Sequence, residues 1–253
     1  MLRVRVIPCL LLRRNGLVKT VKFESAKYVG DPINTVRIYN EKEVDELFFL
    51  DITATPDKRE PPYEMIREIA TECFMPFAYG GGVKTFEQAA RIYAIGAEKV
   101  CLNAAAVENP TLVSRIADRF GSQAVVASID AKKDFFGRYR VVTNGARTST
   151  GRDVVEHAVQ MEKMGAGELL LTSVDRDGTF EGYDSDLVRK VTRAVGIPVV
   201  ACGGAGKLEH LLAPVRDGGA SAVACGSLFV YQGKHRAVLT NYPTRQELTK
   251  LFP

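Results

Sequence analysis

Residues 76–103 have the sequence PFAYGGGVKTFEQAARIYAIGAEKVCLN. A short apolar run at Pro76–Tyr79 leads into three glycines, an amphipathic stretch follows at Thr85–Ile95, and a second apolar run lies at Lys99–Asn103. Two strands joined by a helix, rather than by a tight turn, predict a parallel βαβ unit.

The same alternation continues along the whole chain. Further strands are predicted at Val4–Leu10, Glu46–Asp51, Ala124–Asp130, Glu168–Ser173, Pro198–Cys202 and Ala222–Gly226. Further helices are predicted at Asp31–Glu43, Pro62–Cys73, Asn109–Phe120, Arg152–Met164, Ser185–Val195 and Leu208–Asp217. Eight such units in 253 residues favour a closed (β/α)8 barrel, and a doubly wound open sheet is the alternative.

An internal repeat relates the two halves of the sequence. Gly80-Gly-Gly-Val-Lys-Thr85 recurs as Gly203-Gly-Ala-Gly-Lys-Leu208, and Val100-Cys-Leu-Asn-Ala104 is echoed by Val223-Ala-Cys-Gly-Ser227. We therefore expect a single barrel domain built of two half-barrels, at about 1–120 and 121–253.

Composition excludes several other classes of protein. Hydrophobic residues make up 46% and charged residues 25% of the chain, which are ordinary globular values. The net charge of +4 is too small to indicate nucleic-acid binding. No apolar run approaches the length of about 20 residues that a membrane helix needs, and no signal peptide is evident. The five cysteines lack CxxC spacing, so we expect reduced thiols in the cytoplasm, and neither a metal nor another cofactor.

Glycines follow two of the predicted strands, at Gly80–Gly82 and at Gly203–Gly204. Glycine lets backbone N–H groups approach a phosphate, and the helix that begins next adds a favourable dipole. Asn103-Ala104 and Gly226-Ser227 follow the next strand in each half. Two equivalent anion sites at one barrel mouth predict a substrate with a phosphate at each end. The alternative is that the glycines only form tight turns.

A further turn, at Asp175–Thr179, follows the sixth strand. Asp-Gly is strong turn chemistry, so the segment has a structural interpretation as a capped turn. Its functional interpretation makes Asp177 an acid that faces the mouth and makes the Gly178 N–H a phosphate donor.

Alternation of side chains along the strands predicts a column through the barrel. If Asp130 faces the mouth, the first inward residue of four strands is charged: Arg5, Glu46, Lys99 and Glu168. Two positive and two negative charges form a balanced ring, which reduces the cost of burying them. Above them the inward positions are mostly apolar, up to Thr172 near the mouth of the sixth strand. The ring is either a structural plug or a gate for a small neutral molecule such as ammonia.

These motifs resemble those of the HisF family, the cyclase subunits of imidazole glycerol phosphate synthase, over essentially the whole chain. The matching stretches are Val6–Leu10, Phe49–Ala54, Gly80–Gly82, Asn103–Val107, Phe120–Gln123, Ile129–Lys132, Leu171–Ser173, Asp175–Thr179, Gly182–Asp184 and Gly203–Gly206.

The resemblance implies a (β/α)8 lyase of two half-barrels that pairs with a HisH-like glutaminase and passes ammonia to a bisphosphorylated substrate. It implies acid–base work by Asp130 and closure of the site by Lys19, on the loop after the first strand. Asp177 completes the catalytic set, and Thr172 is assigned to substrate binding. Arg5, Glu46, Lys99 and Glu168 become the ammonia gate. The implied phosphate-binding residues are Gly82, Asn103 and Ala104 at one end, and Gly178, Gly204, Gly226 and Ser227 at the other.

One departure from the family pattern bears on the chemistry. The family has an aspartate at position 11, where this sequence has Leu11. Leucine cannot transfer a proton, and general acid–base catalysis typically contributes about 10²–10⁴-fold, so imidazole ring closure should be slow. The alternative is that Asp51 or Asp177 substitutes.

Other segments resemble the HisF-like proteins of surface-polysaccharide pathways, notably Leu17–Lys22, Glu41–Leu47 and Cys73–Pro76. Such proteins act with a HisH-like glutaminase and a sugar amidotransferase to turn an acetamido group into an acetamidino group. The leading hypothesis is therefore an ammonia-conducting subunit in such a pathway. The alternatives are an authentic cyclase of histidine biosynthesis and a non-catalytic scaffold that activates a glutaminase.

Overall fold

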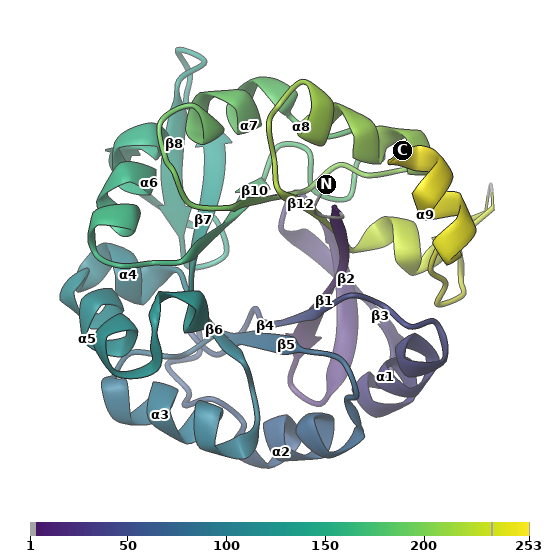
Figure 1. Cartoon of the computed structure of the whole chain (residues 1–253), viewed down its shortest axis with the longest axis horizontal. Coiled ribbons are helices and arrows are strands. Elements are labelled where there is room, and N and C mark those ends of the chain that lie inside the picture. Colours follow the sequence, from purple (N-terminus) through teal and green to yellow (C-terminus); the bar gives the residue numbers. More distant parts are fainter. Residues whose placement is uncertain (1–3, 234, 253) are drawn as a thin grey trace.

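A computed structural model describes residues 4–233 and 235–252. Eight parallel strands form a closed ring, because β7 pairs with both β6 and β10, and β1 pairs with both β12 and β4 (Figure 1). The barrel strands are β1 (Arg5–Arg13), β4 (Leu47–Asp51), β5 (Phe77–Gly80), β6 (Lys99–Leu102), β7 (Val125–Lys133), β10 (Glu168–Ser173), β11 (Val199–Cys202) and β12 (Ala222–Cys225). The predicted (β/α)8 barrel is confirmed, and the open sheet is excluded.

Helices surround the ring on its outer side (Figure 1). They are α1 (Pro32–Glu41), α2 (Tyr63–Glu72), α3 (Phe86–Ile95), α4 (Ala104–Glu108), α5 (Thr111–Phe120), α6 (Val154–Lys163), α7 (Ser185–Thr192) and α8 (Leu212–Arg216). Local sequence defines their ends. In α3, Thr85 and Gln88 form a capping box at the start, and Gly96, with a φ of 126°, ends the helix.

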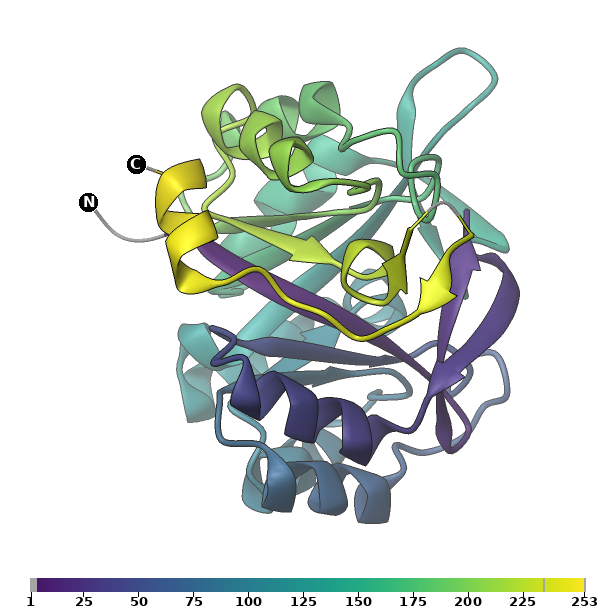
Figure 2. The same cartoon turned by 90° about the vertical axis from the view of Figure 1, so that its right-hand side faces the viewer.

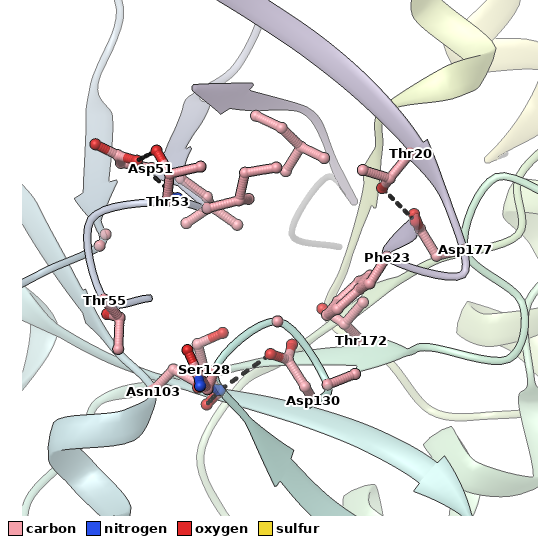
Figure 3. A pocket seen from close by; sticks show the side chains of 18 of the residues that line it. Thr20, Phe23, Asp51, Thr53, Thr55, Asn103, Ser128, Asp130, Thr172 and Asp177 are labelled. Atoms are coloured by element: carbon pink, nitrogen blue, oxygen red, sulfur yellow. Dashed lines mark hydrogen bonds between the residues drawn. The ribbon is translucent and has the colours of Figure 1, made fainter. Parts of the chain in front are cut away.

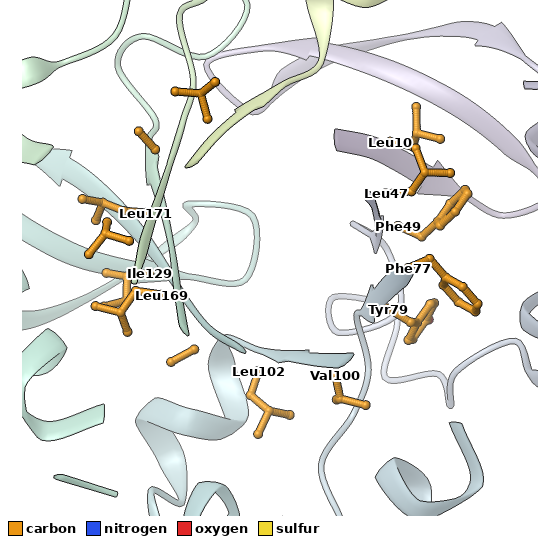
Figure 4. Close-up of a cluster of buried hydrophobic side chains, with 14 of the residues drawn as sticks. Leu10, Leu47, Phe49, Phe77, Tyr79, Val100, Leu102, Ile129, Leu169 and Leu171 are labelled. Carbon is orange, nitrogen blue, oxygen red and sulfur yellow. The ribbon is translucent and has the colours of Figure 1, made fainter. Parts of the chain in front are cut away.

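The main core lies between the strands and these helices. Outward-facing side chains such as Leu10, Phe49, Tyr79 and Leu171 are fully or almost fully buried there (Figure 4). The other face of the strands fills the barrel with a second apolar cluster, which contains Ile7, Cys9, Phe48, Ala78, Cys101, Val126, Leu170, Val200, Ala222 and Ala224. This division matches the alternation expected from the sequence.

Two hairpins beyond the carboxyl ends of barrel strands were not expected. β2 (Gly16–Val21) and β3 (Glu24–Gly30) follow β1, whereas β8 (Tyr139–Thr143) and β9 (Thr148–Asp153) follow β7. Both β1 and β7 extend past the barrel and pair antiparallel with the next strand. The hairpins thus occupy equivalent places after the first and fifth barrel strands, although the proposed half-barrel boundaries remain a prediction. The outer strand of each hairpin, β3 or β9, is largely exposed and lacks the apolar run that marks a core strand, whereas β2 and β8 are mostly buried.

Several predicted boundaries were wrong. The helix expected at Asn109–Phe120 begins at Thr111, because Pro110 disfavours helical geometry at Asn109. The helix expected at Leu208–Asp217 is divided into a 3-10 turn, η2 (Leu208–Leu211), and the short α8. Shorter elements complete the fold: η1 (Ser122–Ala124), η3 (Ser227–Phe229), β13 (Tyr231–Gln232), β14 (Ala237–Val238) and the C-terminal α9 (Arg245–Leu251).

Candidate active site

A cavity of about 1170 Å³ opens at the carboxyl ends of the barrel strands. Its wall contains Asp130, Lys19 and Asp177, and every residue predicted to bind substrate or phosphate: Gly82, Asn103, Ala104, Thr172, Gly178, Gly204, Gly226 and Ser227. This end of a (β/α)8 barrel is where active sites lie, so the fold brings the predicted site residues together at the expected place.

Asp130 lies on β7 beside Thr172 of β10, its partner in the strand register (Figure 3). The Asn103 side-chain amide donates a hydrogen bond of 3.2 Å to the Asp130 carboxylate and another of 3.0 Å to the Ser128 carbonyl. Desolvation raises the pKa of the Asp130 carboxyl to about 7, and the nearby Asp177 adds to the rise. Near neutral pH this group can therefore both donate and accept a proton.

Leu11 and Asp51 both lie in the cavity wall, on the neighbouring strands β1 and β4. Leu11 lies in the cavity wall next to Leu50 of the neighbouring strand. Asp51 is buried, and its Oδ1 accepts three hydrogen bonds of 2.9 Å, from the N–H and hydroxyl of Thr53 and from the N–H of Ala54. Its Oδ2 lies 3.4 Å from the Arg59 guanidinium. Asp51 is therefore committed to the turn that follows β4 (Figure 3).

Lys19 lies on strand β2 and not on a loop, which corrects the sequence-based expectation. The extension of β1 pairs with residues 16–18 and draws the following residues over the barrel. The Lys19 side chain is only 6% exposed, and its ammonium donates to the Cys9 carbonyl at 2.8 Å. A Cβ atom at Gly226 would lie 1.8 Å from the Lys19 Nζ, so the glycine makes room for this lysine.

Asp177 holds the β2–β3 hairpin over the cavity through hydrogen bonds. The Thr20 hydroxyl donates to Asp177 Oδ2 at 2.8 Å, the Phe23 N–H donates to the same carboxylate, and the Lys22 N–H donates to the Asp177 carbonyl at 2.8 Å (Figure 3). Burial raises the pKa of the Asp177 carboxyl, whereas Lys19 and Thr20 act in the opposite direction. Thr20 and Phe23 were missed in the sequence, where only the weak alternation of residues 16–30 pointed to a hairpin.

Gly178 has a steric reason to be glycine. Its φ is +69°, and a Cβ atom there would lie 2.3 Å from the Thr20 carbonyl oxygen and 2.9 Å from the Val21 Cα. The hairpin can therefore seat only against a residue without a side chain. Its turn residues Lys22 and Phe23 have φ values of 52° and 66°. Left-handed geometry at such residues costs about 1–2 kcal/mol each, which the Asp177 hydrogen bonds help to offset.

The glycine-rich turns have the backbone geometry that their sequence predicts. Gly81 and Gly82 have φ values of 120° and 73°, and Gly203 and Gly204 have values of 94° and 110°. A Cβ atom at Gly82 would lie 2.9 Å from the Arg59 carbonyl oxygen, and one at Gly204 would lie 2.1 Å from the Gly182 carbonyl oxygen. Close backbone packing thus requires these glycines whether or not an anion binds.

Each glycine turn has a short helix beside it at the rim of the cavity. Asn103 precedes α4, which begins at Ala104, and Gly226 precedes η3, which begins at Ser227. N–H groups in the first turn of a helix have no partner within that helix. Both rims can therefore offer backbone donors to an anion.

Four charged side chains close the other end of the barrel. Arg5 forms ion pairs with Glu46 and Glu168, and Lys99 Nζ lies 2.7 Å from Glu46 Oε1 and 2.8 Å from Glu168 Oε2. Each carboxylate contacts both cations, so the ring is continuous. Burial tends to lower the pKa of the Lys99 ammonium, but the two carboxylates outweigh it and raise that pKa. We name Arg5, Glu46, Lys99 and Glu168 the charge ring.

Between the charge ring and the cavity lies the apolar cluster inside the barrel. Cys9 and Cys101 belong to it, and all five cysteines of the chain are free thiols. Within the described residues, no group of three histidine, cysteine or acidic side chains could hold a metal ion, and no helix is long and apolar enough to cross a membrane.

Fold and site together define a (β/α)8-barrel protein with a large cavity at the carboxyl ends of its strands and a ring of charges at the other end. A family model described as "Histidine biosynthesis protein" matches residues 5–236. The chain belongs to this family, among its HisF-like imidazole glycerol phosphate synthase members.

Similar proteins cover the whole chain. A Pseudomonas aeruginosa protein named "Putative imidazole glycerol phosphate synthase subunit hisF2" is 53% identical over 98% of this chain and 99% of its own length. A Vibrio vulnificus protein named as subunit hisF3 is 47% identical over 99% of this chain and 96% of its own. A Leptospira borgpetersenii protein named as subunit HisF is 46% identical over the full length of both chains.

Replacement of Gly178 by alanine is expected to lift the β2–β3 hairpin, since the added methyl group meets the backbone at Thr20 and Val21. The amide protons of Lys22 and Phe23 should then exchange with solvent at least about tenfold faster, measured by hydrogen exchange with mass spectrometry. Gly137→Ala is the matched control, because Gly137 also has a positive φ but has open space around it. Equal exchange in both variants would refute the steric role of Gly178.

The pKa of Asp130 should fall when Asp177 is replaced by asparagine. The substitution removes a like charge, and loosening of the hairpin would admit water, so both effects favour the ionised carboxylate. Carbon-13 NMR of the aspartate side chains against pH measures the change. Asp134→Asn, on the exposed β7–β8 turn, should leave the Asp130 titration in place. An unchanged or higher pKa in the Asp177 variant would contradict the coupling.

Proposed function

We propose that this chain is the barrel subunit of a glutamine-dependent amidotransferase, and that it conducts ammonia from the charge ring to the cavity. The observation that supports this most directly is a closed ring of four charges, two buried carboxylates and two partly buried cations, beneath an apolar barrel interior. A HisH-like glutaminase would dock at the ring, which lies at the amino ends of the strands. The HisF subunit names of the relatives favour such a partner.

The apolar interior suits ammonia better than ammonium. An isolated ion inside a protein costs several kcal/mol, whereas neutral ammonia has no such penalty. The interior would therefore deliver an unprotonated nucleophile. Passage requires a transient break between Lys99 and one carboxylate, since the ring is closed in this structure.

The acceptor proposed for this ammonia is an acetamido group of a sugar in surface-polysaccharide synthesis, which becomes an acetamidino group. Leu11 supports this choice, because the cavity wall lacks the acid that the HisF family has at this position. Asp51 is committed to its own turn, and Asp177 holds the hairpin. Ammonia delivery is thus retained, while the proton transfers of ring closure lose one of their two groups. A sugar amidotransferase would complete the system.

The two glycine-rich rims would bind the anionic ends of a phosphorylated small molecule. Gly82, Asn103 and Ala104 form one rim, and Gly178, Gly204, Gly226 and Ser227 form the other. The cavity is large enough for such a substrate, at about 1170 Å³. Backbone N–H donors at the start of α4 and η3 would provide the contacts.

Replacement of Lys99 by methionine should separate a gate from a structural plug. It leaves two buried carboxylates facing Arg5 alone, which favours entry of water and ammonium. We expect product formation with glutamine to fall at least about tenfold, while formation with added ammonium chloride changes less than twofold, because free ammonia enters from the mouth. The assay combines this chain, its cognate glutaminase and its sugar amidotransferase.

Glu72→Gln provides the control for the Lys99 variant. It breaks an ion pair with Arg37 that lies outside the barrel, so it should alter neither activity. An equal loss with both nitrogen sources in the Lys99 variant would identify the ring as a plug. Failure of the wild-type chain to stimulate the glutaminase would reject the proposed function itself.

A second candidate function is the cyclase of histidine biosynthesis. Asp130 favours it, because a carboxyl with a pKa of about 7 suits acid–base catalysis at neutral pH. A genetic test distinguishes the cyclase from the proposed ammonia-conducting function. The proposed function predicts that this chain cannot restore growth of a histidine auxotroph that lacks its own HisF, and that Leu11→Asp improves growth. Full rescue by the unaltered chain would favour the cyclase.

A further inference from the structure

Large apolar side chains are exposed mainly at the cavity end of the molecule. Among the described residues, seven such side chains are exposed, and six follow the carboxyl ends of β1, β7 and β12: Val21, Tyr28, Phe135, Phe136, Val238 and Leu239. The seventh, Phe74, precedes β5 at the opposite end. Figure 2 shows the β2–β3 and β8–β9 hairpins on the side of the barrel away from α9.

The most exposed of these side chains form a pair on the turn between β7 and β8. Phe135 is 97% and Phe136 79% exposed, and their rings meet edge to face with centroids 5.6 Å apart. We name Asp134–Arg138 the aromatic tip. Exposed aromatic residues of this kind are enriched at the energetic centres of protein interfaces.

The aromatic tip is held in one conformation by Asp134. Its Oδ1 accepts hydrogen bonds of 2.9 Å from the N–H groups of Phe136 and Arg138, and its Oδ2 accepts one of 3.0 Å from Arg140. The Asp134 N–H donates to the Arg138 carbonyl at 2.9 Å. A preformed tip loses little conformational entropy when a partner binds.

Strand β7 connects the aromatic tip directly to the candidate active site. Asp130 lies on this strand, opposite Val142 of β8, and Phe135 follows five residues later. An extended strand of that length spans about 17 Å. The turn between β8 and β9 also lines the cavity, through Asn144–Arg147. A protein bound at the tip would therefore lie close to the cavity mouth.

The charges around the tip favour a protein over a membrane. Arg140 is paired with Asp134, and Lys133 Nζ lies 3.8 Å from Asp184. Within the part of the chain that the structure describes, Lys132 and Arg138 have no carboxylate partner, and Arg138 lies over the Phe136 ring at 5.9 Å. Recognition of an anionic membrane typically uses clusters of about 4–8 basic residues. Lys132 lines the cavity, so Arg138 is the free cation beside the two rings, and this arrangement suits an apolar protein pocket with a carboxylate at its rim.

We propose that the aromatic tip is the docking element for the enzyme that consumes ammonia at the cavity mouth, a protein with an apolar pocket edged by a carboxylate. This inference rests on the proposed function, because ammonia must leave by the mouth. The tip and the charge ring lie at opposite ends of the barrel, so this enzyme and the glutaminase can bind at the same time.

The test measures binding of the cognate sugar amidotransferase of the proposed function, by isothermal titration calorimetry. Joint replacement Phe135→Ser and Phe136→Ser should weaken binding at least about 30-fold, since a single hot-spot aromatic commonly contributes that much. Phe74→Ser is the matched control, because it removes an equally exposed ring at the other end, and it should change binding less than twofold. Stimulation of the glutaminase by the double variant should equal that by the wild-type chain.

Four results would overturn this inference. The first is that the double variant binds the amidotransferase with wild-type affinity, and the second is that the wild-type chain does not bind it. The third is that the wild-type chain is a dimer in analytical ultracentrifugation and the double substitution converts it to a monomer. The fourth is wild-type binding to vesicles of phosphatidylcholine and phosphatidylglycerol that the double variant loses, which would assign the tip to a membrane. In each case an intact response of the glutaminase leaves the proposed function standing, whereas loss of that response in the wild-type chain rejects the proposed function instead.

Discussion

The charge ring constrains the rest of the structure. Glu46 and Glu168 each contact Arg5 and Lys99, so removing either cation leaves two buried carboxylates without their full set of partners. The ring also fixes which face of each strand points inward. A shift by one residue would turn these charges toward the apolar layer under the helices, where Leu10 and Phe49 pack. The same alternation then brings Asp130 and Thr172 to the cavity.

The barrel is polar at both ends and apolar between them, and this order has a chemical consequence. Charges at one end are paired with one another, whereas Asp130 at the other end has only an amide donor and a neighbouring acid. The carboxylates of the charge ring raise the pKa of the Lys99 ammonium, whereas burial at the other end raises the pKa of the Asp130 carboxyl to about 7. A single barrel thus combines a ring of paired charges at its base with an acid–base group at its mouth.

Segments added beyond the barrel strands determine what the mouth can bind. The β2–β3 hairpin covers the cavity through a few contacts, with Asp177 at their centre and Gly178 beneath the backbone. The aromatic tip exposes its two phenylalanine rings on a turn that Asp134 orders. One appendage therefore faces the small-molecule site, and the other presents a surface to solvent.

Sequence alone determined the barrel, because alternating strands and helices in a chain of this length leave few other topologies. It also predicted the charge ring, since alternation along one strand is a local property, and it places at position 11 a leucine, which cannot transfer a proton. The tertiary structure decided the roles of Lys19, Asp51 and Asp177. Lys19 is buried only because β2 pairs with β1, and Asp177 is tied to residues more than 150 positions away, Thr20 among them. Such contacts depend on hairpin register and on strained turns such as Lys22–Phe23, which arise from packing across the whole barrel and leave no periodic pattern in the sequence.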